Sequence, residues 1–190
     1  FSFVWSVSVS PSALNCQLIF SPLCKKIYIY ILQGSLQTYE EFTNLLQTKF
    51  HHISDPVMDD VPDSTISGNT IPEKLQDIYI KDVLFEMHMS KVKEYQGHHS
   101  LEDETVDGLL AKVERRLNDM SHRLMKLFMN TDPKIPPPEK PAPPKLSHGD
   151  DMTKKLYGLG VIIRLKEWAT QVLELLKAGE VCKVHHERRP

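Results

Sequence analysis

Six of the nine histidines stand in adjacent pairs, and these pairs are the residues of this chain that could most readily do chemistry: His51-His52, His98-His99 and His185-His186. Neutral imidazole is a common metal ligand, so the pairs raise the hypothesis of a His-rich metal protein. Adjacent residues on a helix point to different sides, however, and neither a His-Glu-x-x-His nor a His-x-His spacing occurs. We therefore interpret the pairs as solvated imidazoles near helix ends and expect no metal and no cofactor.

Three further patterns could support ligand binding or catalysis, and each is incomplete. Gly158 and Gly160 lack the third glycine of a dinucleotide-binding loop and fall inside a helical pattern. The carboxylates at 102–104 lie where a helix begins, and the helix dipole accounts for them. Cysteines form no Cys-x-x-Cys pair, which argues against zinc-finger and thioredoxin types, and the chain has no Gly-x-Ser-x-Gly motif. We expect no enzymatic activity.

Composition narrows the remaining classes. The 190 residues are 41% hydrophobic and carry 23 basic and 25 acidic groups, for a net charge of −2. The near-neutral net charge and the lack of a Lys/Arg-rich run in the sequence argue against a dedicated nucleic-acid binder. The longest apolar stretches, 4–9 and 14–19, are too short to span a membrane. The expected partner is another protein or a small molecule.

The two ends differ from the middle of the chain. Residues 1–20 are apolar or small, uncharged and without helical period, which fits either the remnant of a secretory leader or an unpacked extension. The chain contains no Asn-x-Ser/Thr glycosylation acceptor. Residues 181–190 form a basic tail that we expect to be disordered. The folded domain is expected over residues 24–180.

Four segments between these ends have apolar residues at helical spacing. The first ends near Ser54, before Asp55-Pro56, and the second runs from about Pro72 to Gln96, although Ile78-Tyr79-Ile80 within it resembles a strand. The third follows the cap formed by Ser100 and Asp103. The fourth begins after caps at 150 and 151 and ends at Gly179. The pattern predicts an all-α fold.

The connections between these helices differ in length, and this predicts the topology. About 18 residues join the first two helices, about five join the second and third, and a segment with seven prolines between Asp132 and Pro144 joins the last two. A long connection can run back along a helix, whereas the short one requires antiparallel neighbours. The order long, short, long predicts a long-chain four-helix bundle with up-up-down-down topology and two crossover loops. This topology would bring Cys24 near Cys182, which gives a disulfide hypothesis.

The proline-rich segment and the two glycines each leave two interpretations open. The prolines predict an extended connector that is either a bare spacer or a docking peptide of the SH3-ligand type. Glycine inside a helix costs about 1 kcal/mol relative to alanine. Gly158 and Gly160 therefore indicate either close helix packing or the approach of a receptor to bare backbone.

One motif in the last helix resembles a known family. Lys154-Lys155-Leu156-Tyr157-Gly158-Leu159, followed by Val161, Leu165 and Glu167-Trp168, resembles the last helix of the ciliary neurotrophic factor branch of the helical cytokines, together with leukaemia inhibitory factor and cardiotrophin, which are of the interleukin-6 type. The match covers about 25 residues. The resemblance implies a secreted, extracellular growth factor, neurotrophic factor-like and monomeric, that signals through separate receptor-binding faces.

The resemblance also assigns residues to these faces. The family's Phe-x-x-Lys pair, which contacts the leukaemia inhibitory factor receptor type of chain, corresponds to Met152 and Lys155, with Tyr157 beside it. A receptor-contacting arginine near the end of the same helix is replaced here by Gln171. For the shared signal-transducing subunit, helix geometry selects exposed residues on the first and third helices: Gln37, Glu41, Arg115 and His122.

The expected function is therefore that of a secreted cytokine that bridges cell-surface receptor ectodomains, with no nucleic acid bound and no insertion into the membrane. The alternative is an intracellular helical adaptor that docks its partners through the proline-rich segment. A His-rich metal protein is the third class. Loss of the prolines would remove the partner of an adaptor, whereas it would disturb the folding or helix placement of a cytokine.

Overall fold

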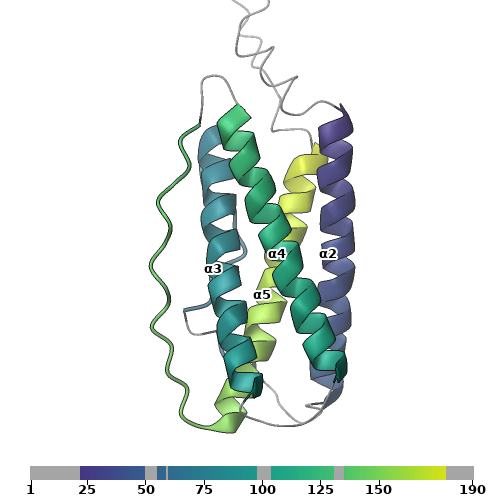
Figure 1. Ribbon diagram of the computed structural model, residues 1–190, viewed down its shortest axis with the longest axis vertical. Coiled ribbons are helices and arrows are strands. Elements are labelled where there is room, and N and C mark those ends of the chain that lie inside the picture. Colours follow the sequence, from purple (N-terminus) through teal and green to yellow (C-terminus); the bar gives the residue numbers. More distant parts are fainter. Residues whose placement is uncertain (1–21, 50–54, 59, 98–103, 131–134, 179–190) are drawn as a thin grey trace, which may run out of the picture.

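The computed structural model describes residues 22–49, 55–58, 60–97, 104–130 and 135–178, and these contain four long α-helices (Figure 1). The helices are α2 (Pro22–Lys49), α3 (Ile71–Gly97), α4 (Glu104–Asn130) and α5 (Asp151–Ala178). No described residue lies in a strand, so the predicted all-α four-helix bundle is confirmed. Within the described helices, none is long and apolar enough to cross a membrane. The extension at 1–20 and the tail at 181–190 lie outside the described residues.

α3 is helical through the strand-like run at 78–80. A capping box starts this helix: the amides of Asn69 and Thr70 donate to the Glu73 carboxylate at 2.8 and 3.1 Å, and the Glu73 amide donates to the Thr70 hydroxyl at 3.4 Å. These hydrogen bonds lower the pKa of Glu73. No glycine or proline interrupts the ladder between Pro72 and Gly97, so the isoleucines adopt the helical conformation of their neighbours.

α5 begins at the cap expected from the sequence. The Asp150 carboxylate accepts hydrogen bonds from the amide and the hydroxyl of Thr153, at 2.8 and 2.6 Å. The same hydrogen bonds lower the pKa of Asp150. The first turn of α5, which carries two of the predicted receptor contacts, is therefore held in a defined position.

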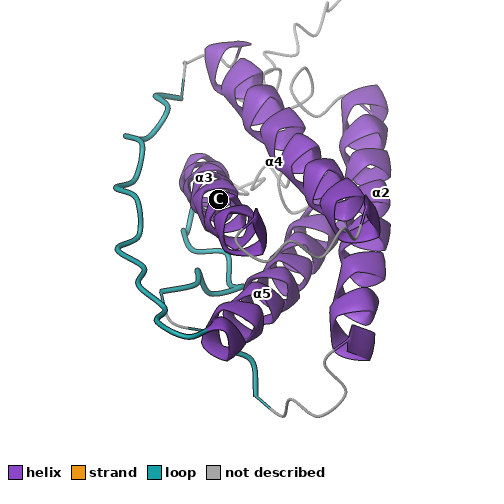
Figure 2. Cartoon of the chain, turned by 60° about the horizontal axis from the view of Figure 1, so that its bottom comes forward, coloured by secondary structure: helices purple, strands orange, loops and turns teal. Residues whose placement is uncertain are grey.

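The helices surround one apolar core. Around the bundle the order is α2, α4, α3, α5, so that α2 lies diagonally across from α3 (Figure 2). Trp168 of α5 and Phe85 of α3 pack against each other in this core, with ring centroids 5.4 Å apart and ring planes tilted by 45°. Each helix contributes fully buried side chains that exclude water from the bundle axis: Phe42, Phe85, Met89, Val113, Phe128, Val161, Ile162 and Leu165.

Contacts between α3 and α4 show that these two helices are antiparallel. Asp82 meets Ser121, whereas Lys93, farther along α3, pairs at 2.7 Å with Glu114, which lies earlier in α4. In Figure 1 the sequence colours run one way along α2 and α3 and the opposite way along α4 and α5. Every neighbouring pair is thus antiparallel and each diagonal pair is parallel.

The segment 55–70 crosses the outside of the bundle and is fixed to two helices. Its Val57 amide donates to the carbonyl of Leu156 in α5 at 3.2 Å. Farther along, the ammonium group of Lys81 in α3 donates to the Thr65 carbonyl at 2.6 Å and pairs with Asp63 at 2.9 Å. The hydrogen bonds from Thr65 and Lys81 lower the pKa of Asp63 to about 2.

The two glycines of α5 provide space for these neighbours. A Cβ atom at Gly158 would lie 3.4 Å from a Val92 methyl group of α3. A Cβ atom at Gly160 would lie only 2.0 Å from the Val57 carbonyl oxygen, which is too close for any side chain. Close helix packing, one of the two interpretations of this glycine pair, is thus confirmed at Gly158, whereas at Gly160 the close neighbour is a loop.

The proline-rich connector follows the outside of α3 over the length of the bundle (Figures 1 and 2). It is held at both ends: Ile135 is buried beside a hydrogen bond of 2.8 Å from Gln76 to the Pro136 carbonyl, and His148 bonds to Tyr95. The prolines at every third residue between these points, Pro138, Pro141 and Pro144, are half-buried, whereas the other residues from 136 to 145 are exposed. Three residues per turn is the period of polyproline II, so one edge of the connector rests on the bundle.

Candidate functional site

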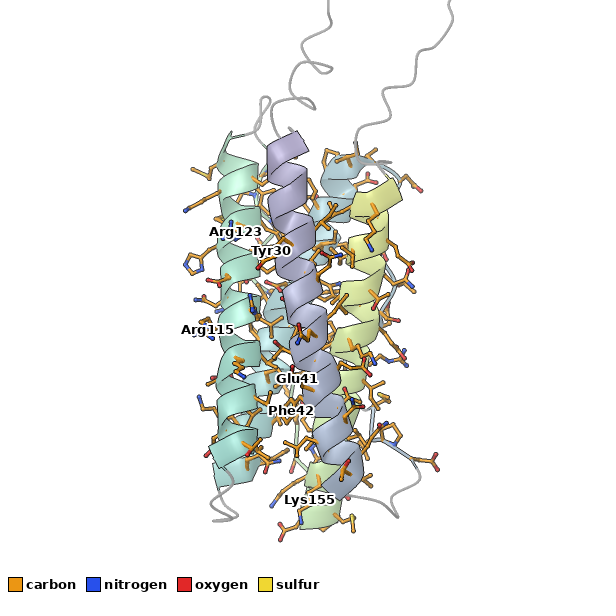
Figure 3. The ribbon with its side chains drawn as sticks, turned by 90° about the vertical axis from the view of Figure 1, so that its right-hand side faces the viewer. Tyr30, Glu41, Phe42, Arg115, Arg123 and Lys155 are labelled. Atoms are coloured by element: carbon orange, nitrogen blue, oxygen red, sulfur yellow. The ribbon has the colours of Figure 1, made fainter. Side chains whose placement is uncertain are left out.

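The start of α5 presents the Met-x-x-Lys pair at one pole of the bundle. Met152 is 53% exposed and Lys155 is half-buried, and residues three apart in a helix lie on neighbouring parts of one face. Lys155 lies at the opposite end of the bundle from Tyr30 and Arg123 (Figure 3). An apolar tip beside a cationic group on a rigid helix is an arrangement suited to binding a protein surface.

Tyr157 does not belong to that surface, which corrects the expectation for this residue. Its side chain is 0% exposed, and its hydroxyl lies 2.6 Å from Nδ1 of His88 in α3. The His148 ring of the connector stacks on it with centroids 4.5 Å apart. Burial raises the pKa of Tyr157, so the phenol stays neutral. Tyr157 supports the start of α5 from inside and cannot contact a receptor directly.

Two histidines and two tyrosines thus form a cluster that sequence reasoning missed: His88, Tyr95, His148 and Tyr157. The Tyr95 hydroxyl lies 3.0 Å from Nδ1 of His148 and accepts a hydrogen bond from the His148 amide at 3.3 Å. Burial lowers the pKa of His88 to about 4, against the attraction of Asp60. The spacing of seven between His88 and Tyr95 places both on one face of α3. This spacing was the only sign of the cluster that the sequence offered.

The exposed face of α2 and α4 carries the other predicted contacts. Gln37 and Glu41 are exposed on α2 and joined by a hydrogen bond of 3.2 Å, and Arg115 and His122 are exposed on α4. His122 donates from Nδ1 to the Asn118 carbonyl at 2.7 Å. The structure therefore places all four side chains at the surface, on two adjacent helices.

A shallow groove of about 420 Å³ lies between the end of α2 and the start of α4. Glu41 and Lys112 line it with opposite charges, and Gly108 leaves its floor open, because a Cβ atom there would meet nothing within 4 Å. The groove extends the surface that carries Gln37 and Glu41 toward the end of α2.

Gln171 lies on a different surface. It is exposed on α5 and lines a second open groove of about 480 Å³, together with Thr43 and Gln47 of α2 and Ser64 of the crossing segment. Lys166 on the same groove pairs with Glu40 of α2. The predicted contacts therefore lie on three separate surfaces and are not gathered into one site.

A partly buried polar network joins α3 and α4 at mid-bundle. The Ser121 hydroxyl of α4 lies 2.5 Å from Oδ2 of Asp82 and 2.7 Å from Oε1 of Glu86, both on α3. A hydroxyl has one hydrogen, so both contacts are hydrogen bonds only if one carboxyl group carries a proton. Burial raises the pKa of the Asp82 carboxyl well above its usual value, which favours Asp82 as the neutral acid.

Tyr39 of α2 faces the same network. Burial raises the pKa of its phenol, and the nearby Asp82 raises it further, while the Arg116 guanidinium of α4 opposes this. Arg116 lies beside Gly34, where a Cβ atom would be 3.5 Å from its terminal nitrogen. These polar groups pack between helices and open into no described groove, so we assign them to the stability of the bundle.

Some predictions concern residues without described side chains. Cys24 and Cys182 of the disulfide hypothesis, and the three histidine pairs, fall there. Among the side chains that are described, no three His, Cys, Asp or Glu residues are grouped as a metal site would require.

Comparisons with known proteins add no relative. No protein-family model, no curated protein and no solved structure matches this chain.

Proposed function

We propose that this chain is a secreted helical cytokine that acts by binding cell-surface cytokine receptors and bridging them. One observation carries the proposal: diagonally opposite helices of this four-helix bundle are parallel, and each such pair is joined by a long outer segment. They support the up-up-down-down class of long-chain bundle, in which growth hormones and cytokines occur. The last-helix motif at 154–168 supports the ciliary neurotrophic factor branch within that class.

The distribution of exposed residues supports bridging. One candidate surface lies at the start of α5 and another on α2 and α4, so two receptor chains could bind without overlap. In this proposal Met152 and Lys155 contact a leukaemia inhibitory factor receptor-like chain, and the α2/α4 surface contacts the shared signal-transducing subunit. Each surface lies on long helices, which hold side chains in fixed positions for a partner.

The adaptor alternative receives less support. A polyproline ligand of the SH3 type presents prolines at every third position to its partner. Within the described part of the connector, residues 135–150, the prolines with this spacing are Pro138, Pro141 and Pro144, and these are the half-buried ones. The edge that an SH3 domain would read therefore faces the protein's own bundle.

The test is a binding panel of purified receptor ectodomains, run with the full chain and with Lys155→Glu. We expect the variant to lose at least about tenfold in affinity for a leukaemia inhibitory factor receptor-like ectodomain, since a cation at an interface would become an anion. Circular dichroism should show unchanged helix content. Lys140→Glu, an equal charge reversal on the connector, is the control and should bind normally.

Two outcomes would contradict the proposal at different levels. Unchanged binding by Lys155→Glu would remove the assignment at the start of α5. A full chain that binds none of the cytokine receptor ectodomains at micromolar concentration would remove the cytokine function itself.

A further inference from the structure

Large apolar side chains are rarely exposed on this bundle, and two of the three within the described part lie on α2 and α4. Tyr30 of α2 is 79% exposed and Met129 of α4 is 55% exposed. A tyrosine that stands out from a rigid helix can bury its ring in a partner at a small cost in conformational entropy. These residues distinguish one end of the α2/α4 surface from the rest of it.

The register between the two helices places Tyr30 beside a basic part of α4. Gly34 lies next to Arg116, and Glu41 shares a groove with Lys112. Residues later in α2 therefore lie beside residues earlier in α4. Tyr30 is one turn before Gly34 and therefore lies level with the turn of α4 that follows Arg116. Figure 3 shows Arg123 at this level and Arg115 on the same side of α4.

The outer face of α4 is mainly cationic. Four basic side chains are exposed along it, with Asp119 among them and Glu41 across from them on α2: Lys112, Arg115, Arg123 and Lys126. Arg115, His122 and Met129 follow each other at intervals of seven, which keeps them on one side of the helix. Tyr30 thus lies at one end of a surface on which basic side chains outnumber acidic ones, although the whole chain has a net charge of −2.

We propose that this surface docks an acidic protein surface that contains an apolar pocket for the Tyr30 ring. The inference rests on the proposed function and deepens it, because it states the chemistry that the receptor chain bound by α2 and α4 must offer. The basic side chains of α4 attract that receptor and orient it, and Tyr30 supplies the anchor that slows dissociation.

Surface plasmon resonance tests this with the ectodomain of the shared signal-transducing subunit as the probe. Tyr30→Ala should weaken binding at least about tenfold, mainly through faster dissociation, and Tyr30→Phe should retain most of the affinity. Arg115→Glu with Lys126→Glu should slow association at least about tenfold and flatten its dependence on salt. Lys140→Glu with Lys145→Glu, the same charge change on the connector, should leave both rates unchanged.

The outcomes separate this inference from the function on which it rests. If the full chain binds the probe and the Tyr30 and Arg115/Lys126 variants bind equally well, the cytokine function stands and the assigned surface is wrong. If Tyr30→Ala leaves binding unchanged while the Arg115/Lys126 variant weakens it, Tyr30 is not the anchor, and the proposed apolar pocket is wrong. If the full chain binds no receptor ectodomain, both proposals fail together.

Discussion

Replacing Asp82 by asparagine should stabilise the bundle at neutral pH and remove part of its pH dependence. The carboxyl group is fully buried, and both it and the Glu86 carboxyl group contact the Ser121 hydroxyl, which has only one hydrogen to donate. Asparagine has the shape of a protonated aspartate and can donate a hydrogen to Ser121 or Glu86 at any pH. The substitution therefore supplies the donor that the network obtains in the natural chain only by holding a proton.

The sign and size of the effect follow from the raised pKa. The Asp82 carboxyl has an ordinary pKa of 3.8, and burial holds it well above that value in the folded chain. Between these two pKa values the folded chain keeps a proton that the unfolded chain has released. The free energy of unfolding should therefore fall as the pH rises through this interval, by up to about 1.4 kcal/mol per pH unit for one proton.

Urea unfolding followed by circular dichroism, at pH 5, 6 and 7, measures this directly in both proteins. The stability of Asp82→Asn minus that of the natural chain should increase with pH until Asp82 ionises in the folded state. Both proteins contain Glu86, Tyr39, Arg116 and His88, so contributions from groups that do not couple to residue 82 cancel in the difference. A difference that stays constant or shrinks as the pH rises would refute the assignment of the proton to Asp82.

Two further predictions concern His88 and the glycines. Burial lowers the pKa of His88 from 6.5 to about 4, so the free energy of unfolding should fall by up to about 3 kcal/mol as the pH falls through that interval. The same unfolding series on Asp82→Asn should show this slope, and the additional substitution His88→Gln should abolish it. Gly160→Ala should lower the free energy of unfolding by about 2 kcal/mol and speed hydrogen exchange of the Val57 amide, because the new Cβ atom would meet the Val57 carbonyl. Gly108→Ala, where a Cβ atom would lie in open space, should instead raise the free energy of unfolding by up to about 1 kcal/mol. Equal unfolding midpoints for the two alanine variants would contradict this account of Gly160.

The helices were predictable because burial on one side leaves a period in the sequence. α4 has the regular pattern, from Val106 to Phe128, since its opposite side faces solvent. α3 shows little period because α4, α5, the segment 55–70 and the connector together cover most of its circumference. That is why the sequence left its isoleucine run ambiguous while the structure is continuously helical.

The details of the candidate sites were less predictable, because they depend on contacts between distant residues. Tyr157 has the same spacing as other inward residues of α5, but its hydroxyl partner, His88, is 69 positions away. Gly160 signals a close neighbour without saying which element supplies it. By contrast, exposure at Gln37, Glu41, Arg115 and His122 followed from helix geometry alone, since polar residues opposite an apolar stripe face water.

Antiparallel neighbours also determine how the protein can be handled in a binding experiment. The start of α2 and the end of α5 lie at one pole, and the first turn of α5 lies at the other (Figure 1). Attachment to a sensor chip at the start of α2 or at the end of α5 would turn Met152 and Lys155 toward the solution and bring Tyr30 close to the chip. Measurements on the α2/α4 surface should therefore keep this chain free in solution and immobilise the receptor ectodomain.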